Sequence, residues 1–91
     1  DTKPAARDAL AAALHPHDAT ARPQILEEEW NLEYHALIRA FQSRTGVGAV
    51  LNTSFNLHGE PIVCTAADAV DTFERSGLQH LAVGHWLISK R

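Results

Sequence analysis

The short apolar run Gly48–Leu51 leads directly into a polar loop and constrains the fold more than any other feature. It is apolar on both faces of an extended strand, a pattern typical of sheets that helices cover. Helical patterns precede and follow it. We therefore expect an α/β (α+β) fold in which a twisted sheet is flanked by helices. Too few strands can be recognised to complete such a sheet, which favours a fragment of a larger one.

Local signals predict three helices. An Ala-rich run covers residues 5–14, Asn31 and Gly46 suit the N-cap and the C-terminal end of a second helix, and Thr65 suits the N-cap of a third. The third helix is expected to turn inward Ala66, Ala69, Val70 and Phe73. The second carries a stripe with helical spacing that predicts core packing: Trp30, Tyr34, Leu37, Ile38 and Phe41. Further strands are expected at residues 24–26, 78–83 and 86–88.

The composition is that of a small globular chain. With 91 residues, a net charge of −3 and no Met, it has room for one domain. Because a natural translation product begins with Met, we expect a piece of a longer protein. The acidic balance argues against a nucleic-acid partner, which requires clustered Lys and Arg. No apolar run approaches the ~20 residues that span a bilayer, so we expect no membrane partner and a cytoplasmic location.

The polar loop after the apolar run is the main candidate site. It presents four small polar side chains: Asn52, Thr53, Ser54 and Asn56. In open α/β sheets ligands bind beyond the carboxyl ends of strands, and hydroxyls and amides there suit a phosphate, a carboxylate or a carbonyl-containing adduct. Alternatively, the loop is a turn whose Asn and Ser groups bond their own backbone. The local pattern supports both interpretations equally.

Arg22 is a second candidate, because a guanidinium in a loop can hold an anion with two hydrogen bonds. A plain surface arginine is the alternative. His15, His17 and Asp18 have metal-ligand chemistry, but the proline between the histidines disfavours a preformed site, so no metal ligand is expected. The lone cysteine, Cys64, follows two apolar residues and is expected to be a buried, inert thiol.

Several strings in matching order resemble one family. They are Thr45-Gly46, Val50-Leu51-Asn52-Thr53-Ser54-Phe55-Asn56, Gly59-Glu60-Pro61-Ile62-Val63, and Asp68-Ala69 with Phe73. Together with Thr20-Ala21-Arg22-Pro23-Gln24, they are similar to the C-terminal end of the NodU/CmcH-type O-carbamoyltransferases. The resemblance covers residues 17–91. A more distant likeness links the polar loop to YrdC-like domains, which make threonylcarbamoyl-adenylate.

The resemblance implies an ATP-dependent carbamoyltransferase. Residues 1–16 would be a helical lead-in or linker, and residues 17–91 the C-terminal portion of a YrdC-like domain. That domain would use ATP, with Mg²⁺, to activate carbamoyl phosphate as carbamoyl-adenylate, releasing pyrophosphate. An N-terminal domain of the same parent chain, which carries a metal, would pass the carbamoyl group to a hydroxyl of a sugar-like or antibiotic-like small molecule. The fragment alone would bind no cofactor and would be inactive.

The resemblance also assigns roles to individual residues. Arg22 would hold a phosphate or the carbamoyl oxygen, Ser54 would contact the carbamoyl-adenylate, and Asn56 would help to fix it. Thr53 and Asn52 are further binding candidates. In one respect the chain departs from the family: where His-x-Asp-Gly-Thr is usual, it reads Pro16-His17-Asp18-Ala19-Thr20. The sequence leaves open whether Ala19 in place of glycine alters this loop.

Two other functions are compatible with the sequence. One is a non-catalytic nucleotide-binding or anion-binding module that uses the same loop. The other is a structural or interaction domain with Trp30 and Trp86 in an interface. Pyrophosphate exchange by the whole protein would separate the enzyme from the binding module.

Overall fold

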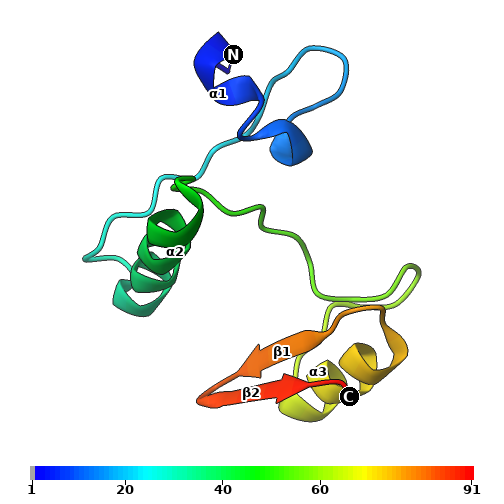
Figure 1. Ribbon diagram of the computed structural model, residues 1–91. Coiled ribbons are helices and arrows are strands. Elements are labelled where there is room, and N and C mark those ends of the chain that lie inside the picture. Colours follow the sequence, from blue (N-terminus) through cyan, green and yellow to red (C-terminus); the bar gives the residue numbers. More distant parts are fainter. Residues whose placement is uncertain (1) are drawn as a thin grey trace. The chain divides into compact units, whose positions relative to one another are not determined.

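The computed structural model describes residues 2–91, which form two compact units, one ending at Asn52 and the other beginning at Thr53. The helices and strands (Figure 1) are α1 (Pro4–Arg7), a 3-10 turn (Ala11–Ala13), α2 (Leu32–Thr45), α3 (Ala66–Arg75), β1 (His80–Val83) and β2 (Trp86–Ser89). Helices with a two-stranded antiparallel sheet confirm the expected α+β fragment. No helix in the described residues is both long and apolar enough to cross a membrane.

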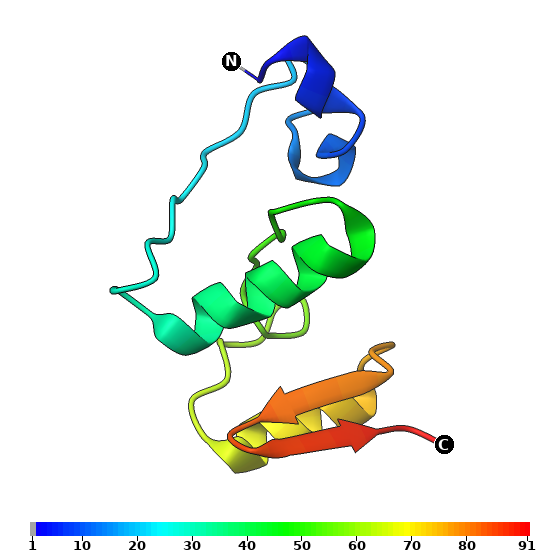
Figure 2. The ribbon, with the colours of Figure 1, turned by 60° about the vertical axis from the view of Figure 1, so that its left-hand side comes forward.

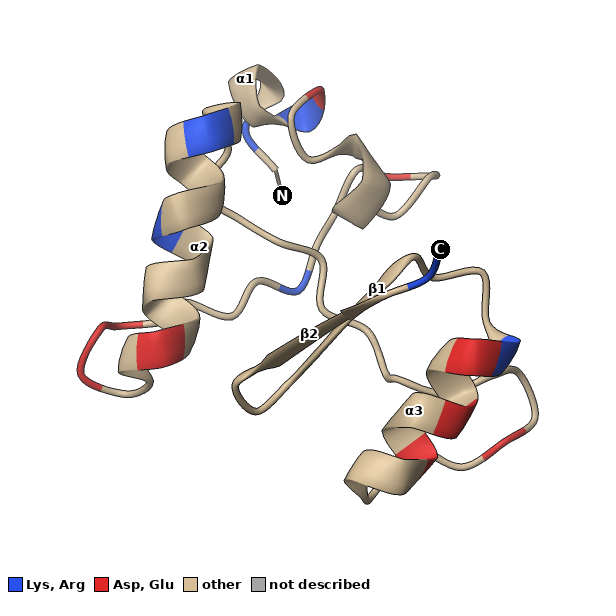
Figure 3. Cartoon of the chain, turned by 60° about the horizontal axis from the view of Figure 1, so that its bottom comes forward, with Lys and Arg blue, Asp and Glu red and all other residues tan. Residues whose placement is uncertain are grey.

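Helix α2 of the first unit begins and ends where its sequence predicts. The Asn31 side chain accepts a hydrogen bond from the Tyr34 N–H, at 3.0 Å, and supplies a partner for a helix donor that otherwise has none. At the other end Gly46 takes a left-handed conformation with φ 78°, and its N–H donates to the Gln42 carbonyl. Figure 3 shows acidic residues at the start of α2 and basic residues toward its end, which suits the helix dipole.

The apolar stripe of α2 does not form the predicted core. Leu37 is 61% exposed and Phe41 is 41% exposed, while Tyr34 and Ile38 are half-buried. No residue of α2 is buried. Since an apolar stripe is buried only against an opposing surface, the reason is that the described residues cover this stripe only in part.

The first unit also contains fewer regular elements than expected. The Ala-rich run forms α1 and the separate 3-10 turn rather than one helix over residues 5–14, in keeping with the marginal stability of short helices. Residues 24–26 and 48–51 form no strand. A strand requires a hydrogen-bonded neighbour, and no strand among the described residues pairs with them. Leu51 accordingly remains 59% exposed.

The second unit is built around a small apolar core. Strands β1 and β2 form a hairpin in which Leu81 lies opposite Ile88, and α3 packs against it (Figures 1 and 2). The core consists of Ala69, Phe73 and Leu81, with Phe55, Val63, Val70 and Ile88 packed around it. Within α3, Ala66 is exposed and Thr72 is buried. Ala66 is the first residue of α3 and is not among the residues that pack on the core, so the prediction that it turns inward was wrong.

Helix α3 begins with a capping box. The Thr65 hydroxyl accepts from the Asp68 N–H at 3.1 Å, and the Asp68 carboxylate accepts from the Thr65 N–H at 2.9 Å. The helix ends at Arg75, and Ser76 is its C-cap residue. Cys64 is exposed, so the expectation of a buried thiol was wrong. Its neighbour Val63 packs against the core, and in an extended segment the next side chain points away from it.

Candidate functional site

The polar sequence that resembles the family continues into a closed loop between Phe55 and Val63. The Val63 N–H donates to the Phe55 carbonyl at 3.0 Å, and the Glu60 N–H donates to the Leu57 carbonyl at 3.0 Å. Gly59 adopts φ +82° at the turn, a conformation that side chains disfavour. Phe55 and Val63 pack against the core, so both ends of the loop are anchored in the second unit.

The Asn56 side chain forms two hydrogen bonds within this loop. Its Nδ2 group donates to the Leu57 carbonyl at 3.1 Å and to the Glu60 carbonyl at 2.9 Å. An amide nitrogen has two N–H donors, so the loop uses its donor capacity and leaves the Oδ1 oxygen as the group it can offer a ligand. The interpretation of the loop as a turn bonded to its own side chain therefore holds for this residue.

A three-residue ion-pair network fastens the loop to α3. The two terminal nitrogens of Arg75 donate to the two Glu60 carboxylate oxygens, at 2.6 and 2.9 Å. Arg75 also donates to Asp71 Oδ2, from Nε at 3.0 Å and from a terminal nitrogen at 2.7 Å. Hydrogen bonds from Arg75 lower the pKa of Glu60, and the two carboxylates raise the pKa of Arg75. Both shifts favour the charged forms of Glu60 and Arg75.

The two hydroxyl residues of the candidate site, Thr53 and Ser54, directly precede the Phe55–Val63 loop. Thr53 and Ser54 are exposed, whereas Phe55 directly after them is half-buried in the core. Their position ties them to an anchored residue and leaves their hydroxyls accessible to a ligand. A hydroxyl can both donate and accept, which suits a phosphate oxygen or a carbamoyl group.

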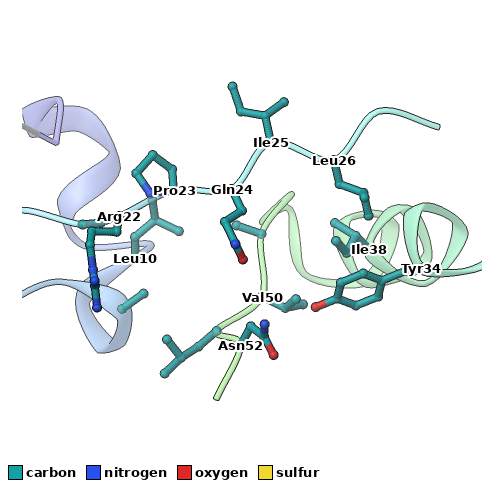
Figure 4. Close-up of a pocket in the computed structure, with 14 residues that line it drawn as sticks. Leu10, Arg22, Pro23, Gln24, Ile25, Leu26, Tyr34, Ile38, Val50 and Asn52 are labelled. Carbon is teal, nitrogen blue, oxygen red and sulfur yellow. The ribbon is translucent and has the colours of Figure 1, made fainter. Parts of the chain in front are cut away.

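The first unit contains a cavity of ≈ 460 Å³ that Arg22 and Asn52 line together (Figure 4). Gln24 and Tyr34 also line it, and Figure 4 shows their side chains directed toward its middle. Ile25 also lines the cavity, and its side chain remains 77% exposed. The volume lies in the range of small-ligand pockets, and the polar lining combines a cation with amide and phenol groups.

A strained turn leads into the Arg22 segment. Asp18 Oδ1 accepts from the Thr20 N–H at 3.0 Å and from the Thr20 hydroxyl at 2.7 Å, and the hydroxyl bond is the main cause of the lowered pKa of Asp18. Between them Ala19 adopts φ 54°, a conformation that glycine takes without cost. Ala19 thus occupies a backbone conformation that favours the glycine usual in the resembled family.

Other features of the surface fit an anionic ligand less well. A wider hollow of ≈ 610 Å³ is lined by Glu27, Glu28, Glu29 and Leu32, whose carboxylates would repel a phosphate. Among the described residues no three His, Cys, Asp or Glu side chains gather into a group that could hold a metal ion. Two places remain that suit an anionic ligand. One is the cavity lined by Arg22 and Asn52, and the other is the segment of the second unit that carries the Thr53 and Ser54 hydroxyls.

The structure brings some of the predicted site residues together. Arg22 and Asn52 share the cavity of the first unit, and Thr53, Ser54 and Asn56 belong to the second unit. Tyr34, which the sequence predicts as part of the apolar stripe of α2, also lines this cavity. Arg75 was not predicted as a site residue, although the spacing of one helical turn between Asp71 and Arg75 was a visible signal.

Comparison with known proteins identifies the family. The family model described as carbamoyltransferase C-terminus matches residues 1–90. Nodulation protein NolNO of Sinorhizobium fredii is 49% identical over 85 residues, which cover 93% of this chain and 12% of that protein. The 3'-hydroxymethylcephem-O-carbamoyltransferase of Amycolatopsis lactamdurans is 36% identical over 75 residues, or 82% of this chain and 14% of that enzyme.

An archaeal relative extends the range of these similarities. The uncharacterized protein MJ1051 of Methanocaldococcus jannaschii is 47% identical over 73 residues, which cover 80% of this chain and 14% of that protein. The chain thus spans 12% to 14% of the length of these curated relatives. The comparisons confirm the resemblance to the C-terminal part of the NodU/CmcH-type O-carbamoyltransferases, and the chain belongs to the carbamoyltransferase C-terminus family.

Proposed function

We propose that this chain forms the C-terminal part of an ATP-dependent O-carbamoyltransferase and helps to bind an activated carbamoyl group. The observation that carries this proposal is the match of residues 1–90 to the carbamoyltransferase C-terminus. The Amycolatopsis relative, which is named as an O-carbamoyltransferase, supports the reaction class.

The proposed activation step consumes carbamoyl phosphate, ATP and water. It yields carbamoyl-adenylate, pyrophosphate and inorganic phosphate, so that one mixed anhydride of the carbamoyl group replaces another. A hydroxyl of a small acceptor molecule then attacks the carbamoyl carbon, the bond to AMP breaks, and the hydroxyl proton leaves. Stabilising the adenylate requires hydrogen-bond donors fixed beside phosphate charge.

Arg22 and Asn52 are proposed to bind the phosphate end of the ligand. A guanidinium can donate two parallel hydrogen bonds to a phosphate, and Arg22 lines a cavity of sufficient volume, ≈ 460 Å³. The Asn52 amide lines the same cavity and can donate to a phosphate oxygen or accept from an adenine amino group. Their shared cavity supports a joint role.

Ser54 is proposed to contact the carbamoyl group, with Thr53 beside it. Both hydroxyls are exposed next to the anchored Phe55. A neutral hydroxyl donates to the carbamoyl oxygen and, unlike a thiolate or amine, does not compete strongly as a nucleophile for the anhydride. The remaining oxygen of Asn56 can accept from the carbamoyl NH₂ group, because the loop already occupies its N–H donors.

Other components are proposed to come from beyond these residues. Mg²⁺ would accompany ATP, and a metal ion and the acceptor would bind to an N-terminal domain of the whole enzyme. Since both substrates of the activation step are intracellular metabolites, a cytoplasmic location follows from the proposal. The isolated 91-residue chain is expected to show no turnover with carbamoyl phosphate, ATP and an acceptor.

The test is the exchange of labelled pyrophosphate into ATP, dependent on carbamoyl phosphate, by the whole enzyme that carries this sequence. Ser54→Ala should lower the exchange rate by roughly 100- to 1000-fold, as expected when one hydrogen-bond donor to a transition state is removed. Ser43→Ala is the matched control, because the Ser43 hydroxyl bonds the Ala40 carbonyl of α2 at 2.9 Å and should not affect exchange. An enzyme without any exchange would contradict the proposal and favour a binding module.

A further inference from the structure

We propose that Arg75 is a positioning residue, which holds the Phe55–Val63 loop through Glu60 so that Ser54 and Asn56 meet the carbamoyl ligand. The inference rests on the proposed function and adds to it a residue on α3 that does not itself touch the ligand. Its basis is a continuous chain of hydrogen bonds within the second unit.

The first step of this chain fixes the guanidinium. Arg75 lies one helical turn after Asp71, whose Oδ2 accepts two hydrogen bonds from it, at 3.0 and 2.7 Å. An exposed arginine otherwise samples many rotamers. Bound in this way, the guanidinium presents its two terminal nitrogens to Glu60 as a planar fork.

The second step fixes Glu60. The fork donates to both carboxylate oxygens, at 2.6 and 2.9 Å, across a separation of 15 residues. Two parallel hydrogen bonds set the orientation of the carboxylate as well as its position. The side chain of Glu60 is therefore attached to α3, which packs on the core through Ala69 and Phe73.

The third step transmits this attachment to the candidate site. The Glu60 carbonyl accepts from Asn56 Nδ2 at 2.9 Å, and the Glu60 N–H donates to the Leu57 carbonyl at 3.0 Å. Asn56 is two residues from Ser54. A displacement of Glu60 would thus break the bond that orients the Asn56 amide and would loosen the chain beside Ser54.

The network is better suited to positioning than to global stability. The Arg75 and Glu60 side chains are 45% and 40% exposed, and exposed ion pairs contribute little to the stability of a fold. Loops with few buried contacts open locally without global unfolding. Loss of the network should therefore loosen the loop and leave the core intact.

The experiment compares Arg75→Gln, Glu60→Gln and the double variant in the whole enzyme, with Arg39→Gln on α2 as the control. Hydrogen exchange should speed up at the amides of Glu60 and Val63, whose bonds close the loop, and stay unchanged in β1 and β2. Pyrophosphate exchange should fall by roughly 10- to 100-fold, in kcat or KM, as expected for a small misplacement of catalytic groups. The double variant should lose as much activity as each single variant, because each substitution removes the same Arg75–Glu60 interaction.

Arg75→Lys keeps the charge but not the fork and should restore only part of the activity. Full activity in Arg75→Gln, with exchange lost in Ser54→Ala, would overturn the positioning role and leave the proposed function standing. Uniformly faster hydrogen exchange across the second unit would also overturn it, because it would show a general stabilising role. No exchange in the unsubstituted enzyme would overturn the proposed function and with it this inference.

Discussion

The two units differ in how they use their apolar side chains. The second unit, from Thr53, buries Ala69, Phe73 and Leu81 and closes its loop onto α3. In the first unit no described residue is buried, and large side chains such as Trp30 and Leu51 are exposed by 67% and 59%. The second unit thus has a core of its own, whereas the first unit has a capped helix, α2, without a core.

This difference shows that helix-capping signals can define a helix whose apolar residues are not buried. Asn31 and Gly46 delimit α2 even though no residue of its apolar stripe is fully buried. Caps contribute about 1 kcal/mol each, which is less than the burial of one large side chain. The first unit is therefore expected to depend on added contacts for its rigidity, and the second unit is not.

The largest expected effect is on the core of the second unit. Phe73, which is 2% exposed, also lies 4.8 Å beneath the Lys90 ammonium. Phe73→Ala should cost about 3–5 kcal/mol and unfold the unit. Trp30→Ala in the first unit should change stability by less than about 0.5 kcal/mol. Hydrogen exchange of the β1 and β2 amides checks the first substitution and that of the α2 amides checks the second. Equal effects of the two substitutions, each on its own unit, would contradict the comparison.

The next effect concerns the turn of the Phe55–Val63 loop. Gly59 has φ +82° and Gly77 does not have a positive φ, and an added Cβ meets no atom within 4 Å at either position. Gly59→Ala should therefore cost roughly 1–2 kcal/mol through backbone strain alone, whereas Gly77→Ala should be neutral or slightly stabilising. Denaturant unfolding of the two variants measures the difference. Equal costs would exclude strain at Gly59 as the cause.

A smaller and opposite effect is expected in the first unit. Ala19 already adopts φ 54°, so Ala19→Gly should relieve strain and stabilise the turn by about 0.5–1 kcal/mol. The turn contains His15, Asp18, Ala19 and Thr20. Slower hydrogen exchange at the Ala19 and Thr20 amides would confirm that the substitution stabilises it. A loss of protection there would show that the left-handed conformation is not strained.

The smallest expected effect is a dependence on pH. Hydrogen bonds from Arg75 lower the pKa of Glu60 below its ordinary 4.5, and those from Thr65 lower the pKa of Asp68 below 3.8. A lowered carboxyl pKa stabilises the fold above the unfolded-state value, and this contribution is lost as the pH falls through the folded-state pKa. The second unit should thus lose stability below about pH 4.5, and Glu60→Gln with Asp68→Asn should flatten that loss in acid titrations followed by circular dichroism.

Sequence alone predicted the features that short segments determine. The caps of α2 and α3 were predicted because their signals lie within a few residues of the helix ends. The exposure of Leu37 and Leu51 was not, because burial depends on surfaces distant in the sequence. The pairing of Arg75 with Glu60 also joins distant residues, so no local pattern revealed it. The polar residues of the candidate site were predicted from the motif and stay a prediction, whereas the hydrogen bonds of the Asn56 amide within its own loop required coordinates.

The central proposal is that Ser54, with Thr53 and Asn56, contacts the carbamoyl group of carbamoyl-adenylate, and that Arg22 and Asn52 bind its phosphate end. The most direct measurement is hydrogen exchange of the whole enzyme with and without a sulfamoyl analogue of carbamoyl-adenylate. The account predicts new protection at Thr53 to Asn56 and around Arg22, and loss of that protection in Ser54→Ala. Saturated binding of the analogue with protection confined to other segments would contradict it.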